Sequence, residues 1–172
     1  IDAVVAATNT QAFIDGSKDP IRARYLIESK LWDCSVITLI RDGRGFFNSY
    51  MRHTSAPMAE AVAAWQAKVQ EMEHLQKIAG ANSIVVRYED LCQDPLTVVN
   101  RVLAAASLEP LSTIDFPLTN SNRHIFGNAM RLREIDAVVA DEKWRAGLTQ
   151  ADLEVFYREA GEMNDRYGYA AH

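Results

Sequence analysis

The chain has 172 residues, of which 48% are hydrophobic and 24% are charged. This composition suits one compact domain with a hydrophobic core, and it excludes both a disordered chain and two well-developed domains. The formal net charge of -5 argues against a nucleic-acid partner, because duplex binding needs a broad basic surface. No apolar stretch is long enough to cross a membrane. We therefore expect one domain over residues 1–172.

The chain opens within a helical pattern. Residues 1–7 already have the character of a helix end, and no initiator Met is present, so we expect the natural protein to begin earlier. Residues 11–15 are predicted to form a short strand. Asp19 and Pro20 then predict a helix start, with Asp19 as the cap and Pro20 in the first turn.

The middle of the chain alternates between strands and helices. Residues 35–40 are β-branched and apolar, as in a parallel strand covered on both faces, and residues 44–52 are predicted to be helical. The clearest helix spans residues 57–79 and ends at Gly80. Its apolar residues recur at steps of three and four. They are Met58, Val62, Trp65, Val69, Met72 and Leu75.

The last part of the chain adds one strand and two helices. Residues 83–86 predict a second buried strand, and Asp94 with Pro95 opens a helix to about residue 106. Residues 108–121 are predicted to be a loop, and Thr149 caps a final helix. This order predicts an α/β fold with a parallel sheet flanked by helices, whose ligand site lies beyond the carboxyl ends of the strands.

Two cysteines, Cys34 and Cys92, are too few for a disulfide framework or a metal cluster. We expect free thiols, with Cys34 buried, which fits a reducing compartment. No His or Cys cluster has metal-ligand spacing, so no metal is expected.

The residue types that follow residue 40 are typical of an anion site. Asp42 can cap the new helix, whose N-terminus offers free N–H groups, and Arg41 adds a cation. Ser49 follows eight residues after Arg41 and can donate a hydroxyl. The spacing alone also fits an ordinary arginine after a strand and a serine on a helix surface.

Residues 36–52, which contain Arg41-Asp-Gly-Arg44, resemble the 3′-phosphate-binding segment of sulfotransferases that use 3′-phosphoadenosine 5′-phosphosulfate (PAPS). In that family a strand ends in Arg-Asp-Pro-Arg, and a serine follows eight residues after the first arginine. The resemblance implies that Arg41 and Ser49 hold the 3′-phosphate. Gly43 stands where proline is usual.

Three further segments resemble the same family in the same order. Residues 84–95 resemble its strand-Tyr-Glu-Asp-Leu segment, which implies that Tyr88 lies near the adenine; a half-buried tyrosine covering the sheet is the alternative. We expect Glu89 and Asp90 to be structural, capping the following turn. Residues 13–20 resemble the Asp-Ser-Ser-Lys-x-Pro stretch of bacterial-type members, which implies that Lys18 reaches the transferred sulfonate; a solvated loop lysine is the alternative.

A late loop and the tail complete the resemblance. Residues 124–131 resemble a Gly-Asn-x-x-Arg loop of bacterial-type members. This implies a 3′-phosphate contact by Gly127, Asn128 and Arg131, whereas His124 also fits a structural role. In the tail, we interpret Trp144 and Tyr169 as packing anchors.

The resemblance implies the sulfotransferase fold, which is similar to P-loop nucleotide kinases, and transfer of a sulfonate from PAPS to a hydroxyl of a small molecule, lipid or sugar. Adenosine 3′,5′-bisphosphate would be the product, and a cytoplasmic location is expected. The family's 5′-phosphosulfate loop, typically Arg-Ser-Gly-Thr, is absent from the chain, so we expect a fold incomplete at its N-terminus and no transfer by these 172 residues alone. The general base is not assigned, because Pro20 stands where one branch has histidine.

Two other functions stay open. One is a non-catalytic nucleotide-binding or interaction domain that kept the 3′-phosphate site. The other is a phosphotransferase of similar fold, against which the absence of a Gly-x-x-x-x-Gly-Lys-Ser/Thr motif counts.

Overall fold

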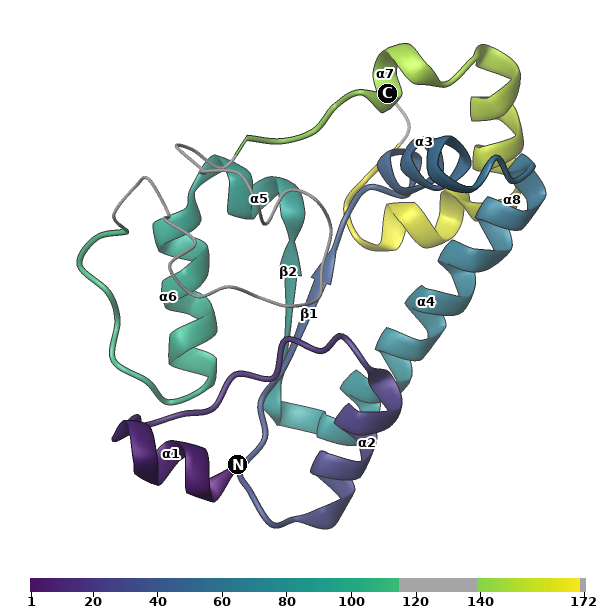
Figure 1. Ribbon diagram of the computed structural model, residues 1–172. Helices are drawn as coiled ribbons and strands as arrows, with labels where there is room; N and C mark the ends of the chain where they lie inside the picture. Colours follow the sequence, from purple (N-terminus) through teal and green to yellow (C-terminus); the bar gives the residue numbers. More distant parts are fainter. Residues whose placement is uncertain (115–138, 171–172) are drawn as a thin grey trace.

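Two parallel strands run through the centre of the protein, with helices on both sides (Figure 1). The computed structural model describes residues 1–114 and 139–170. In this part of the chain β1 (Val36–Ile40) pairs with β2 (Ser83–Arg87), with Ile40 opposite Arg87. The predicted α/β fold with a parallel sheet is confirmed. Because both strands point the same way, their carboxyl ends meet at one edge.

The helices form two groups about the strands. Helix α4 (Met58–Ala79) contacts both strands, and α6 (Pro95–Ala105) contacts β2 from the other side (Figure 1). Helices α2 (Pro20–Ser29), α3 (Gly43–Thr54) and α8 (Gln150–Arg166) pack against α4. The short elements are α1 (Asp2–Thr8), η1 (Gly80–Asn82), α5 (Tyr88–Gln93) and α7 (Trp144–Gly147).

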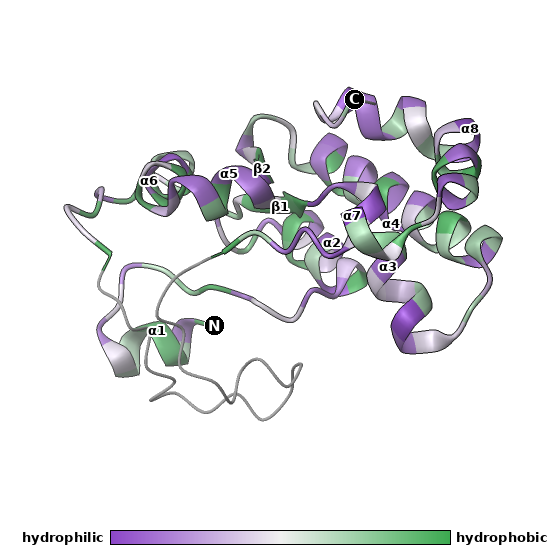
Figure 2. Cartoon of the chain, turned by 90° about the horizontal axis from the view of Figure 1, so that it is seen from above, coloured by the Kyte–Doolittle hydropathy of each residue, from purple (hydrophilic) through white to green (hydrophobic). Residues whose placement is uncertain are grey.

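The core lies where α3, α4 and α8 meet beside β1. The apolar stripe predicted on α4 is confirmed, because Val62, Trp65 and Val69 are all buried. Phe47 of α3 and Phe156 of α8 meet edge-on, with ring centroids 4.8 Å apart, and both are fully buried. In Figure 2 β1 is green (hydrophobic), whereas the helices around it carry both colours, as expected for helices that bury one face.

The predicted helix starts are confirmed by their hydrogen bonds. Asp19 caps α2 by accepting from the amides of residues 21 and 22, and Asp94 caps α6 by accepting from Thr97. Thr149 and Asp152 form a reciprocal capping box at the start of α8. Local sequence therefore sets these boundaries without help from distant residues.

The strand predicted over residues 11–15 is wrong. These residues are exposed and belong to no strand, with Ile14 82% accessible. Instead Asp15 accepts from the Ser17 amide and pairs with Arg22, which ties the segment to the start of α2. Such side-chain bonds offer a short polar segment an alternative to a ladder.

Three smaller differences concern the faces of β1, the end of β2 and the cysteines. The expectation that β1 is covered on both faces is wrong, because Ile37 and Leu39 are 47% and 52% exposed. Residues 88–93 form α5, a helix that the sequence pattern does not predict. Cys34 and Cys92 are both free, but Cys34 is only half-buried rather than fully buried. Burial and the nearby Asp33 carboxylate raise the pKa of the Cys34 thiol. The part of the predicted loop that the structure describes, residues 108–114, contains no helix or strand.

Candidate functional site

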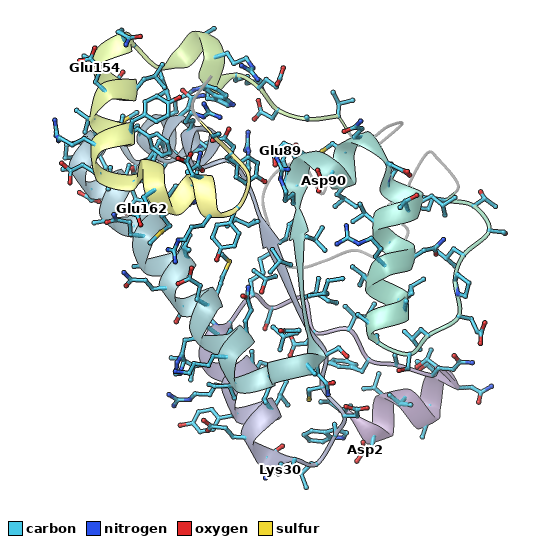
Figure 3. All side chains as sticks on the ribbon, turned by 180° about the vertical axis from the view of Figure 1, so that it is seen from behind. Asp2, Lys30, Glu89, Asp90, Glu154 and Glu162 are labelled. Carbon is cyan, nitrogen blue, oxygen red and sulfur yellow. The ribbon has the colours of Figure 1, made fainter. Side chains whose placement is uncertain are left out.

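Charged and aromatic side chains gather where the two strands end. Residues 41–44 follow β1 and residues 88–90 follow β2, so the parallel pairing brings both segments to one edge. Figure 3 shows Glu89 at this end of the strands and Lys30 at the opposite end. The location is the one that α/β proteins use for ligands.

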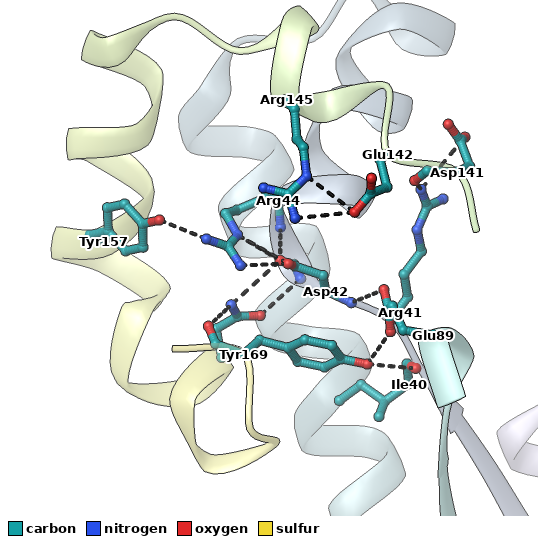
Figure 4. A network of polar contacts seen from close by, with 12 residues as sticks. Ile40, Arg41, Asp42, Arg44, Glu89, Asp141, Glu142, Arg145, Tyr157 and Tyr169 are labelled. Atoms are coloured by element: carbon teal, nitrogen blue, oxygen red, sulfur yellow. Dashed lines mark hydrogen bonds and ion pairs between the residues drawn. The ribbon is translucent and has the colours of Figure 1, made fainter. Parts of the chain in front are cut away.

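Arg41 lies at the rim of this edge. Its Nη2 donates to the main-chain carbonyl of Asp141 at 2.5 Å and lies 3.5 Å from the Asp141 carboxylate (Figure 4). The guanidinium also lies 5.1 Å from the centre of the Tyr88 ring. The side chain keeps 28% of its surface exposed. Arg41 is therefore held by contacts that solvent or a ligand can reach.

Arg41 and Ser49 share one side of α3. A Cβ atom added to Gly45 would lie only 2.7 Å from Arg41 Nε, so the arginine side chain passes directly over this glycine. Ser49 lies four residues further along α3, one helical turn from Gly45 and on the same face, and it is half-buried. The Arg41 side chain, which comes from the residue before the cap, and Ser49 therefore lie along the same side of α3.

Tyr88 opens α5 and holds a distant segment. Its Oη donates to the Val139 carbonyl at 3.1 Å and accepts from the Asp141 amide at 3.2 Å. Burial, together with a hydrogen bond to Cys92, raises the pKa of Tyr88. The tyrosine is half-buried, as in the alternative interpretation of a residue that covers the sheet.

The helix N-terminus expected as an anion site is occupied by protein groups. Glu89 accepts from the Asp42 amide at 3.3 Å, Asn164 accepts from Gly43 at 2.8 Å, and Asp42 accepts from Arg44 at 2.9 Å. The expectation of free N–H groups is therefore wrong for Asp42 and Gly43, whereas the predicted cap by Asp42 is confirmed. Glu89 of α5 and Asn164 of α8 supply the acceptors for these two amides, and no local sequence pattern predicts either of them.

A buried ion pair stands beside this turn. Arg44 Nη2 lies 2.6 Å from Asp42 Oδ2 (Figure 4). The guanidinium also covers the Trp144 ring at 4.3 Å. Arg44 also donates to Tyr157 Oη at 2.8 Å. Both charged side chains are less than 9% exposed. Arg44 is fully committed to the fold, so Arg41 is the cation of this motif that remains accessible.

Glu89 and Tyr169 join the strand ends to the C-terminal segment. Tyr169 Oη donates to Glu89 Oε2 at 2.5 Å, and the Tyr169 ring lies under the Arg87 guanidinium at 4.4 Å. Burial and the Glu89 carboxylate raise the pKa of Tyr169. Glu89 is structural, as expected, but it bonds to Asp42 and Tyr169 and does not cap the following turn. The expectation that Trp144 and Tyr169 are packing anchors agrees with their burial.

A cavity of about 170 Å³ opens beside these residues. It lies between the strand ends, the segment before α7 and the C-terminal segment. Its lining is highly charged. Six of the residues that line it are Arg44, Arg87, Glu89, Asp141, Trp144 and Arg145.

Other candidates from the sequence are not brought to this site. Lys18 is exposed in the segment before α2, with a left-handed φ of 58°, and no described contact joins it to Arg41, Ser49 or Tyr88. The predicted contacts by Gly127, Asn128 and Arg131, and also His124, lie outside the described residues.

Two residues that bond to the segment after β1 are not predicted by the sequence pattern. Asn164 is fully buried in α8 and bonds to Gly43, to Tyr169 and, at 3.4 Å, to Asp42. Asp141 reaches Arg41 across 100 positions of the chain. The one available signal for Asn164 is a polar residue in the apolar stripe of its helix; nothing local marks Asp141.

The fold and this edge define an α/β protein with an accessible arginine after a central strand. A family model described as "Sulfotransferase family" matches residues 3–112. The chain belongs to the sulfotransferase family. Comparisons with curated proteins and with solved structures gave no match.

The described part of the chain lacks two features, a metal-binding cluster and a membrane-spanning helix. Within residues 1–114 and 139–170, no group of three or more His, Cys, Asp and Glu side chains is placed to hold a metal ion. In the same part of the chain, no helix has the length and apolar character needed to span a bilayer.

Proposed function

We propose that this sulfotransferase uses PAPS as its donor, and that Arg41 and Ser49 bind the 3′-phosphate of the nucleotide. The observation that carries the proposal is the position of Arg41: it follows the central strand, remains accessible, and shares a face of α3 with Ser49. An arginine and a hydroxyl on one face suit a phosphate, because they supply charge-assisted hydrogen bonds.

The residues present fit such an anion. Arg41 already holds a carboxylate and a carbonyl oxygen, both from Asp141, so its guanidinium is placed to receive acidic oxygens. Gly45 gives the side chain room, since a Cβ there would lie too close to Arg41. Tyr88 lies beside Arg41 and would contribute its ring to the adenine, with Gly127, Asn128 and Arg131 adding further phosphate contacts.

The reaction would move a sulfonate from the donor's 5′-phosphate oxygen to an acceptor hydroxyl of a small molecule, lipid or sugar. Lys18 is proposed to stabilise the charge on the leaving phosphate oxygen, because a fixed ammonium lowers the energy of developing negative charge. Lys18 is exposed, which leaves it accessible to a donor.

The test compares two nucleotides that differ only in the 3′-phosphate. Adenosine 3′,5′-bisphosphate and adenosine 5′-monophosphate are titrated calorimetrically into the wild-type chain and Arg41→Ala. A charge-assisted bond contributes about 1.5–3 kcal/mol, so the variant should bind the bisphosphate roughly ten- to a hundredfold more weakly. Binding of the monophosphate should barely change.

Arg101→Ala is the matched control, since Arg101 is an exposed arginine on α6. It should leave both affinities unchanged. Equal losses for both nucleotides in Arg41→Ala, or a wild-type chain that does not distinguish them, would overturn the assignment. The latter result would favour a phosphotransferase, whose ATP-like donor carries no 3′-phosphate.

A further inference from the structure

One segment of the chain is hydrogen-bonded to Arg41 and Tyr88, two of the side chains proposed to bind the nucleotide. Residues 139–143, named the strap here, cross the strand ends just before α7. Tyr88 Oη bonds to the strap at two points, the Val139 carbonyl and the Asp141 amide. Asp141 Oδ1 in turn accepts from the Lys143 amide at 3.1 Å, which folds the strap into a tight turn.

The strap presents acidic oxygens to Arg41. The carbonyl and the carboxylate of Asp141 lie 2.5 Å and 3.5 Å from Arg41 Nη2 (Figure 4). Burial opposes ionisation of Asp141, but the Lys143 amide and the charge of Arg41 outweigh it and lower the pKa of this carboxyl. Asp141 is therefore ionised at neutral pH and stands where an anionic ligand oxygen would have to lie.

We propose that Asp141 is a specificity-determining residue: its carboxylate competes with the 3′-phosphate for Arg41, and the strap must leave Arg41 before the 3′-phosphate binds. This inference rests on the proposed function. The geometry sets the two in competition, because Arg41 Nη2 already faces the carbonyl and the carboxylate of Asp141, and a phosphate oxygen at this atom has to replace them. A phosphate group carries more charge than a carboxylate, so the bisphosphate can displace the strap.

The exposure of the pair makes this exchange feasible. Arg41 and Asp141 keep 28% and 37% of their side-chain surfaces exposed. Ion pairs near solvent contribute little to stability, so releasing this one costs little. A ligand without a 3′-phosphate gains no bond at Arg41, and it therefore displaces the strap poorly.

The first experiment measures nucleotide affinity in Asp141→Asn. Removing the competing charge should tighten bisphosphate binding about three- to tenfold, whereas binding of adenosine 5′-monophosphate should change by less than about twofold. Glu142→Gln is the matched control, because it removes the same charge from the neighbouring residue, which pairs with Arg145 rather than Arg41. It should change both affinities by less than about twofold.

The second experiment follows the strap itself by amide hydrogen exchange over residues 139–144. Saturating bisphosphate should speed exchange in the strap, and Arg41→Ala should do so without any nucleotide. Protection of the strap by the bisphosphate, or unchanged affinity in Asp141→Asn while Arg41→Ala still loses the bisphosphate, would overturn the inference and leave the proposed function standing. If Arg41→Ala binds the bisphosphate as the wild type does, the proposed function itself fails.

Discussion

Arg41 and Arg44 lie three residues apart but have opposite environments, because Arg41 is accessible and Arg44 is buried. Arg44 is less than 9% exposed and is bonded to Asp42 and Tyr157. Arg41 keeps 28% of its surface, and its carboxylate partner, Asp141, lies 3.5 Å away. The buried arginine belongs to a network that fixes the first turn of α3, while we propose that the accessible one exchanges its partner for a ligand.

The contrast shows that one short motif, residues 41–44, contains both a structural arginine and an arginine that a ligand can reach. A buried charge must be fully paired, because an unpaired charge in a low-dielectric interior is very costly. A charge near solvent can exchange partners cheaply, which is what ligand binding requires. Variants that treat the two arginines alike should therefore have very different effects.

The largest expected effect is on the stability of Arg44→Ala. The substitution leaves the Asp42 carboxylate buried without its partner, and we expect a loss of about 3–5 kcal/mol in the free energy of unfolding. Arg41→Ala should cost less than about 1 kcal/mol. Urea unfolding followed by circular dichroism measures both.

A double variant sharpens this test. Asp42→Asn with Arg44→Met leaves no unpaired charge and should recover part of the lost stability. Equal losses in Arg41→Ala and Arg44→Ala would contradict the division of roles.

Asn164→Ala should have the next largest effect. It removes the acceptor of the buried Gly43 amide and a donor to the Tyr169 carbonyl, which leaves two buried polar groups unpaired. We expect a loss of about 2–3 kcal/mol in urea unfolding. Asn82→Ala is the control, since Asn82 is exposed and bonds to Asp33 at the other end of the sheet; it should cost less than about 1 kcal/mol. A similar loss in both would mean that the α3 turn needs no support from α8.

The pH dependence of stability tests a third contact at the strand ends, the hydrogen bond from Tyr169 to Glu89. Burial raises the pKa of Tyr169 above its ordinary value of 10.0, so the folded state favours the neutral phenol. Its contribution is complete below pH 10.0 and is lost as the pH rises further. Tyr169→Phe should therefore flatten the fall of unfolding free energy in alkaline solution. An unchanged alkaline slope would show that Tyr169 does not carry it.

The smallest stability effect is expected for Gly45→Ala. The new Cβ would meet the flexible end of Arg41, which can move aside, and alanine favours the helix by about 1 kcal/mol. Stability should rise slightly, while bisphosphate affinity falls because Arg41 is displaced. Gly161→Ala on α8 is the control, since its Cβ would make ordinary contacts with Tyr157. It should not weaken nucleotide binding; weakening by both variants would point to a general helix effect.

The sequence by itself determined what depends on near neighbours. Helix starts at Asp19, Asp94 and Thr149 follow from side chains that bond within three residues, and the α4 stripe follows from helical periodicity. The parallel strands and the common edge they create also follow from local pattern and element order. So does the position of Ser49 one turn beyond Gly45 on the same face of α3, because a helix fixes the geometry of residues four apart.

Tertiary structure alone decided which groups at that edge stay accessible. The amides of the α3 turn are taken by Glu89 and Asn164, which lie 47 and 121 positions away in the chain from their partners. Asp141 reaches Arg41 from 100 positions away. Residues 11–15 also lack a strand in the folded chain, although their local pattern favours one. Pairing over such distances depends on how the helices pack around the strands, and no short window of sequence carries that information.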